Sequence, residues 1–125
     1  MLNDVCRVND SLLLTTDSFK GHVLMVNIFT GTYTVLKGNM AVPNGVCYDA
    51  AADKVYVCAM GPNYDGTGKV YAKKHVYDLN KKQYTTINTQ RAPADIALDA
   101  KQQVLLMPQM LDNQLKIIPL KEYGL

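Results

Sequence analysis

The chain alternates short apolar segments with turn residues from one end to the other. Residues 22–28 are mostly apolar, which is typical of a strand covered on both faces. Residues 93–103 are the best candidate for a helix, but Ile96 and Leu98 lie two positions apart, a spacing that favours a strand. The pattern therefore predicts an all-β protein.

Each apolar segment is predicted to form one short strand that ends at a cluster of Gly, Asn, Asp or Pro. Residues 61–68 are rich in these turn residues and are expected to form an inserted loop. The expected strands are residues 4–8, 11–16, 22–28, 32–36, 45–48, 54–60, 69–79, 83–87, 94–98, 103–109 and 114–120.

Three segments resemble one another and divide the expected strands into repeats. They are anchored on Asn3, Asn44 and Ala94, which lie 41 and 50 residues apart. Blades of β-propellers repeat at about 40–50 residues and hold four strands each. The sequence therefore predicts a single β-propeller segment of four-stranded antiparallel blades. The blades are expected near residues 1–40, 41–90 and 91–125.

The third repeat is expected to be an incomplete blade. After Leu120 only five residues follow, too few for a turn and a fourth strand. Propellers have about 4–8 blades, so three leave an open ring and a bare edge strand that invites pairing with another chain. Two alternatives are open. The chain is the C-terminal part of a longer propeller, or two or more copies assemble into a closed ring, and two copies would give six blades.

One repeat carries a family pattern at the start of its first strand. The pattern is residues 43–49 (PNGVCYD), followed by an aromatic-aliphatic strand. Residues 93–99 (PADIALD) and 2–5 (LNDV) are degenerate copies of it. The pattern resembles the SMP-30/gluconolactonase/LRE-like and NHL-like β-propellers, and the resemblance covers nearly the whole chain as three repeats.

This resemblance implies a polar site at the mouth of a central channel. In the lactonase members, Asn and Asp side chains of several innermost strands hold a divalent cation, usually calcium. That cation polarises a lactone carbonyl and orients a water. By this resemblance, Asn44 and Asp95 would be metal ligands, and Asn3 and Asp4 would lie near the bound ligand.

The chain departs from the family pattern where catalysis depends on it. Ala94 stands where the family has Asp after Pro, so Asp95 is shifted by one residue and would point to the opposite face of its strand. The family's Glu ligand has no counterpart, because Glu122 is the only Glu in the chain. We therefore expect first a non-catalytic module that binds a small molecule or a protein at the channel face. The alternative is one part of a metal-dependent lactone hydrolase.

The same polar residues also suit a purely structural role. Asn and Asp at the start of a strand satisfy backbone groups of turns. Gly45 would allow a tight approach at the centre of the ring. On this interpretation the repetition follows from the blade structure and requires no ligand.

Composition and charge narrow the class of protein. The chain has 48% hydrophobic and 19% charged residues, which excludes an intrinsically disordered protein. No apolar run reaches the roughly 18 residues of a membrane-spanning helix. The net charge of +2 is small for a protein that binds nucleic acid. Binding of nucleic acid through Lys73, Lys74, Lys81 and Lys82 is therefore the weakest hypothesis.

The three cysteines, Cys6, Cys47 and Cys58, have no C-x-x-C spacing. This argues against a disulfide framework and a structural zinc site, and we expect small buried apolar side chains. Residues 1–7 lack the basic and apolar regions of a signal peptide. A cytoplasmic location is expected if the chain is complete, and an extracytoplasmic one is open if it is a piece of a secreted propeller.

Overall fold

Three antiparallel sheets make up the computed structural model, which describes residues 1–63, 67–74, 84–88 and 91–125. Their strand orders are β1-β2-β3-β4, β5-β6-β7-β8 and β9-β10-β11. Neighbours in each sheet are consecutive in the chain, as in a meander. The strands are β1 (Leu2–Arg7), β2 (Leu12–Asp17), β3 (His22–Asn27), β4 (Tyr33–Lys37), β5 (Pro43–Asp49), β6 (Lys54–Ala59), β7 (Lys69–Lys74), β8 (Thr85–Asn88), β9 (Ala97–Asp99), β10 (Val104–Gln109) and β11 (Gln114–Pro119).

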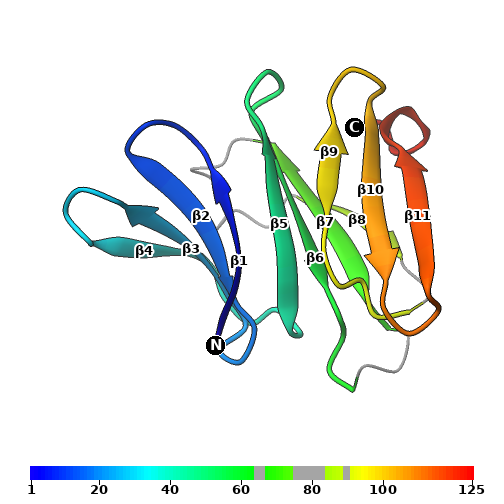
Figure 1. Cartoon of the computed structure of the whole chain (residues 1–125), viewed down its shortest axis with the longest axis horizontal. Helices are drawn as coiled ribbons and strands as arrows, with labels where there is room; N and C mark the ends of the chain where they lie inside the picture. The colour runs from blue at the N-terminus through cyan, green and yellow to red at the C-terminus, as the bar shows by residue number, and fades with distance from the viewer. Residues whose placement is uncertain (64–66, 75–83, 89–90) are drawn as a thin grey trace.

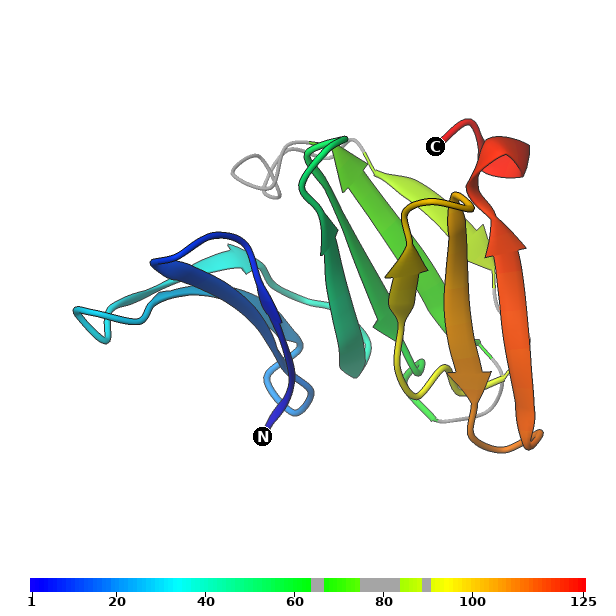
Figure 2. The ribbon, with the colours of Figure 1, turned by 45° about the horizontal axis from the view of Figure 1, so that its top comes forward.

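The three sheets stand in a row, with the β5–β8 sheet between the other two (Figure 1). Figure 2 shows the same order after a rotation that brings the top of the molecule forward. The first strands of the sheets are neighbours, because β1 packs beside β5 and β5 packs beside β9. Adjacent blades around a common axis have this arrangement, with the first strand of each blade innermost.

Apolar side chains fill both spaces between the sheets. Because side chains alternate along a strand, each sheet directs every second residue toward its neighbour. We call the space between β1–β4 and β5–β8 the first junction, and that between β5–β8 and β9–β11 the second junction. The buried apolar residues of the first junction are Leu14, Val23, Leu36, Met40, Val46, Val55, Val57 and Ala59, and those of the second are Tyr56, Cys58, Val70, Ala72, Ile87, Ile96, Leu105, Met107, Ile118 and Leu120.

Most expected strands lie within two residues of their predicted bounds. The strand predicted over residues 94–98 is the main difference, since β9 covers only Ala97–Asp99. Pro93 and Ala94 still pair with β10, through a bridge to Gln109 and a bond from the N–H of Ala94 to the carbonyl of Pro108, but the pairing is interrupted before β9 begins. Residues 75–79, the second half of the strand expected over 69–79, lie outside the described part of the chain.

The chain also ends differently from the prediction. The last expected strand was to reach residue 120, but β11 ends at Pro119 and Leu120–Tyr123 form a 3₁₀ turn. Leu120 is buried in the second junction, and this anchors the turn. Among the described residues the third sheet has three strands.

Candidate functional site

The innermost strands β1 and β5 carry the same irregularity at the same place. The pairing of β1 with β2 shifts register within residues 2–5, and the pairing of β5 with β6 shifts within residues 43–46. A bulge leaves backbone groups without partners in the ladder. These groups lie at the repeat positions Asp4 and Gly45, where side chains of the neighbouring strand accept their N–H bonds.

Asp4 connects the first sheet to the second. Its Oδ1 accepts the N–H of Val5 at 2.7 Å, and its Oδ2 accepts the N–H of Val46 in β5, also at 2.7 Å. The N–H of Asp4 donates to Oγ1 of Thr16 at 3.2 Å, and that hydroxyl donates to the carbonyl of Asn44. Asp4 therefore has a structural function in the first junction. Its role toward a bound ligand stays a prediction.

Asn3 takes part in the same connection through one intermediate residue. Its Nδ2 donates to Oγ of Ser18 at 3.1 Å, and that hydroxyl donates to the carbonyl of Pro43 at 2.7 Å. Sequence reasoning missed Thr16 and Ser18. The available signal was a run of hydroxyl residues at the end of a predicted strand, where an apolar residue is usual.

The second junction is built differently, because Gly45 stands where the first repeat has Asp4. A Cβ at Gly45 would lie 2.6 Å from the backbone nitrogen of Ile96 and 2.8 Å from Cα of Asp95. The N–H of Gly45 donates to Sγ of Cys58 at 3.2 Å. The tight approach predicted at Gly45 is thus confirmed, and the segment that comes close is the backbone of Asp95 and Ile96 just before β9.

The two predicted metal ligands lie on neighbouring segments in different surroundings. Asn44 is buried, and its Nδ2 donates to Sδ of Met60 at 2.9 Å. Asp95 is exposed, and one of its oxygens accepts the N–H of Ile96. Within the described residues, no three His, Cys, Asp or Glu side chains gather as a metal-binding group. The metal role of Asn44 and Asp95 stays a prediction.

The three cysteines are free thiols, with Cys6 on β1, Cys47 on β5 and Cys58 on β6. Cys58 is fully buried, whereas Cys6 and Cys47 are half-buried. Burial raises the pKa of the Cys6 and Cys58 thiols to about 12, and it also raises the pKa of Cys47. A thiol that remains protonated at neutral pH is a poor nucleophile. These residues therefore act as apolar packing groups.

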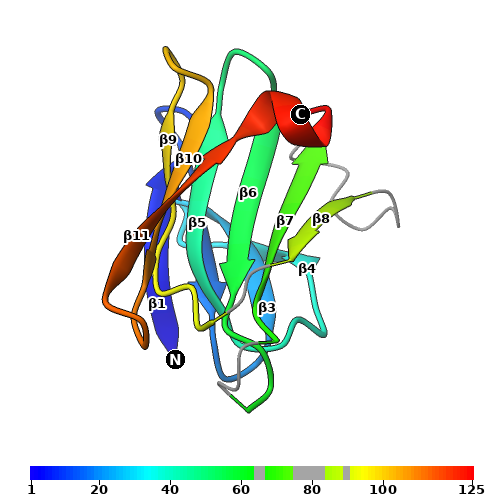
Figure 3. The same cartoon turned by 90° about the vertical axis from the view of Figure 1, so that its right-hand side faces the viewer.

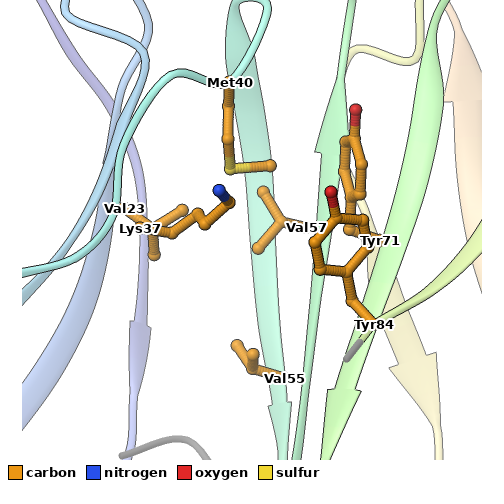
Figure 4. A pocket seen from close by; sticks show the side chains of 7 residues that line it. All are labelled: Val23, Lys37, Met40, Val55, Val57, Tyr71 and Tyr84. Atoms are coloured by element: carbon orange, nitrogen blue, oxygen red, sulfur yellow. The ribbon is translucent and has the colours of Figure 1, made fainter. Parts of the chain in front are cut away.

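A narrow slot opens at the first junction, away from the inner strands. Its volume of about 20 Å³ leaves room for little more than one water. The rings of Tyr71 and Tyr84 meet edge to face with centroids 5.4 Å apart, and Nζ of Lys37 lies 5.8 Å from the Tyr84 centroid. Figure 4 shows these side chains converging from both sheets. The slot is therefore part of the packing between blades.

The outer side of the third sheet is apolar and uncovered. Residues on this side alternate with those of the second junction, and the strand register pairs Leu106 with both Ala97 and Ile117, and Pro108 with Leu115. Leu115 is 60% exposed and Ile117 is 58% exposed. Figure 3 views the chain from this end. We call this side, formed by Ala97, Val104, Leu106, Pro108, Leu115, Ile117 and Pro119 with Asp99 beside Val104, the second open face.

The outer side of the first sheet is also largely apolar. Two shallow hollows cover it, and they extend to Asp17, Lys20 and His22 at one end. Val5 is 58% exposed on this side, although it lies in the middle of an inner strand. We call this side, formed by Leu2, Val5, Leu13, Thr15, Leu24, Val26, Tyr33 and Val35, the first open face.

The lysines considered for nucleic acid binding give no further support. Lys73 and Lys74 belong to β7, while Lys81 and Lys82 lie outside the described residues. In the part of the chain that the structure describes, no helix has the length and hydrophobicity needed to cross a membrane.

Comparisons with known proteins identify the class of fold. No known protein family and no curated protein matches the chain. The WD40 β-propeller domain of Doa1 matches with 17% identity and a TM-score of 0.67, over 93% of this chain and 36% of that chain. A chain of a nidogen/laminin complex matches with 12% identity and a TM-score of 0.58, over 90% of this chain and 45% of that chain.

At these identities the matches show the fold alone, and they confirm the predicted all-β propeller class. The chain spans less than half the length of each matched structure. The resemblance to the SMP-30/gluconolactonase family receives no support from these comparisons.

Proposed function

We propose that the chain is a non-catalytic protein-binding module of the β-propeller class, which binds through its open faces. The observation that carries the proposal is the second open face. An antiparallel sheet exposed to water normally alternates apolar and polar residues, so that one side is polar. Here both sides are apolar, and large side chains such as Leu115 and Ile117 are more than half exposed. Apolar surface of this extent is typical of an interaction site.

The polar groups of the inner strands support the same conclusion. Asp4, Thr16 and Ser18 use their side chains to hold the first junction together, and the cysteines are buried or half-buried neutral thiols. One matched structure is a nidogen/laminin complex, so a fold of this kind occurs in an assembly of proteins. Binding of a small molecule near Asn3 and Asp4, and a part in metal-dependent lactone hydrolysis, remain alternatives without a supporting contact.

Site-specific photo-crosslinking tests the proposal. A photoreactive phenylalanine analogue replaces Ile117 on the second open face, and in a matched control it replaces Phe29, which is 77% exposed in the turn after β3. The proposal predicts a protein adduct from position 117 and none from position 29. If the two positions behave alike in cells of the native host, the second open face is not a binding surface.

A further inference from the structure

The junction chemistry is repeated at one position that has no neighbouring sheet. Asp4, Gly45 and Asp95 occupy the same place in the three repeats. One oxygen of Asp4 accepts the N–H of the following residue, and the other accepts the N–H of Val46 on the next sheet. One oxygen of Asp95 makes the same local bond, to Ile96 at 2.7 Å. The Asp95 carboxylate is therefore oriented as Asp4 is, at the exposed edge of the row.

The repeat shows which N–H donor would lie nearest to the second oxygen of Asp95. In the first junction the donor is Val46, the residue that follows the repeat position in β5. Its equivalent in β1 is Val5, which is 58% exposed on the first open face. An inner strand placed beside Asp95 as β5 is placed beside Asp4 would bring Val5 to the carboxylate. The N–H of Val5 already donates to Oδ1 of Asp4, so this contact depends on the apolar side chains of the two faces and not on a second bond to Asp95.

The two open faces are also the two halves of one kind of junction. Leu106 occupies the register position in the third sheet that Leu14 occupies in the first. Leu14 lies on the side of the first sheet that packs on β5–β8, so the second open face is the equivalent side of the third sheet. The first open face corresponds in the same way to the side of β5–β8 packed on β1–β4, because Val5 corresponds to Val46. The two open faces are therefore equivalent to the two sides that pack against each other in the first junction.

We propose that the occupant of the second open face is the first open face of a second copy of this chain. Two copies related by a two-fold axis would form this contact twice and close a ring of six sheets. In each contact the apolar side chains around Ile117 would pack against those around Val5 of the other copy. This inference rests on the proposed function and names its partner.

Two considerations favour a second copy over an unrelated partner. One kind of chain supplies both apolar faces, so a dimer covers both at once with a packing that the chain already uses at its two junctions. The two faces are also alike in character, because each exposes apolar side chains such as Val5 on one and Ile117 on the other.

Charged substitutions on the two faces test the contact. Ile117→Glu and Val35→Lys each place a charge on one open face. Both side chains are exposed and lie outside the core of the monomer. Each variant alone is expected to weaken self-association roughly tenfold or more, measured by sedimentation equilibrium. A mixture of the two should regain dimer, because one contact is then wild type and the other pairs opposite charges. Phe29→Glu is the control and should leave association unchanged.

The outcomes separate this inference from the proposed function. Association of the wild type that both single variants weaken and their mixture restores supports the second copy. A wild type that stays monomeric at all concentrations overturns it. In the photo-crosslinking experiment, an adduct of twice the chain mass from position 117 supports the inference. An adduct with a different protein overturns the second copy and leaves the proposed function standing. No adduct overturns both.

Discussion

The two junctions join neighbouring sheets by different means. In the first junction, oxygen atoms of Asp4, Thr16 and Ser18 bridge to the backbone of β5. In the second, Gly45 removes the side chain at the repeat position, and the backbones of the two segments come into direct contact. The same repeat position therefore joins neighbouring sheets in two ways. In the first junction a carboxylate bonds across the space between the sheets, and in the second a glycine lets the two backbones touch. Asp95 also places a carboxylate at this position, and there it accepts the N–H of the neighbouring Ile96 at the open edge.

The largest expected effect comes from Gly45→Ala, which places a methyl group where two backbone segments of the second junction are in contact. A Cβ would lie 2.6 Å from the backbone nitrogen of Ile96, and two backbone segments cannot yield as a flexible side chain can. We expect a loss of about 3 kcal/mol in the free energy of unfolding, measured in urea.

Gly38→Ala is the matched control for this variant. Its Cβ would meet only the ring of His22, at an ordinary distance of 3.6 Å. The expected change is within about 1 kcal/mol. Equal losses in the two variants would contradict the close contact at Gly45.

The next effect distinguishes the two aspartates. Asp4→Ala leaves the N–H of Val46 without its acceptor in a partly buried place, and we expect a loss of about 2 kcal/mol. Asp95→Ala removes only a local bond from an exposed residue in the monomer, and we expect a loss of about 0.5 kcal/mol. Unfolding at a concentration low enough to keep the chain monomeric measures both. A larger loss for Asp95→Ala than for Asp4→Ala would contradict the conclusion that Asp4 joins two sheets and Asp95 does not do so in the monomer.

A smaller effect concerns the thiol in the second junction. The pKa of Cys58 rises from 9.0 to about 12 through burial, so between these values the unfolded chain has lost a proton that the folded chain keeps. The contribution of this thiol to stability is therefore constant below about pH 9 and falls as the pH rises further, by about 1.4 kcal/mol per pH unit.

Cys58→Ala tests this dependence. The variant should show a shallower decline of the unfolding free energy between about pH 9 and pH 10 than the wild type. Urea titrations at several pH values measure the slope. An unchanged slope would show that Cys58 ionises with equal ease in the folded and unfolded chains.

The smallest expected effect concerns the prediction that Asn44 and Asp95 are metal ligands. If the resemblance to calcium-binding lactonases extends to this chain, calcium should bind in a saturable way, and both Asn44→Ala and Asp95→Ala should abolish the binding. Isothermal titration with calcium alone provides the measurement. Binding that survives in either variant would show that these residues are not the ligands.

The sequence was sufficient to predict much of the fold. Turn residues and apolar segments located most strands, and the repeat anchors marked the inner strands β1 and β5. Gly45 was predicted to permit a close approach, since few other roles explain a glycine at the start of an inner strand. The strand over residues 94–98 was misplaced because the pairing with β10 is interrupted between Pro93 and Ala97, which periodicity does not reveal.

The candidate site was harder to predict for a physical reason. Whether Asp4 faces a channel or a neighbouring sheet depends on a bulge within residues 2–5, and a shift of one residue reverses the direction of a side chain. The alternation of Leu115 and Ile117 was visible in the sequence. Their exposure was not, because it depends on which side of the third sheet faces the second.

The most direct test of the account is the mass of the chain in solution, measured by light scattering during gel filtration. The account predicts a species of twice the 13.9 kDa chain mass at high concentration, which Ile117→Glu converts to a monomer and Phe29→Glu does not. A wild-type chain that elutes as a monomer at every concentration would contradict the claim that its two open faces are halves of one junction.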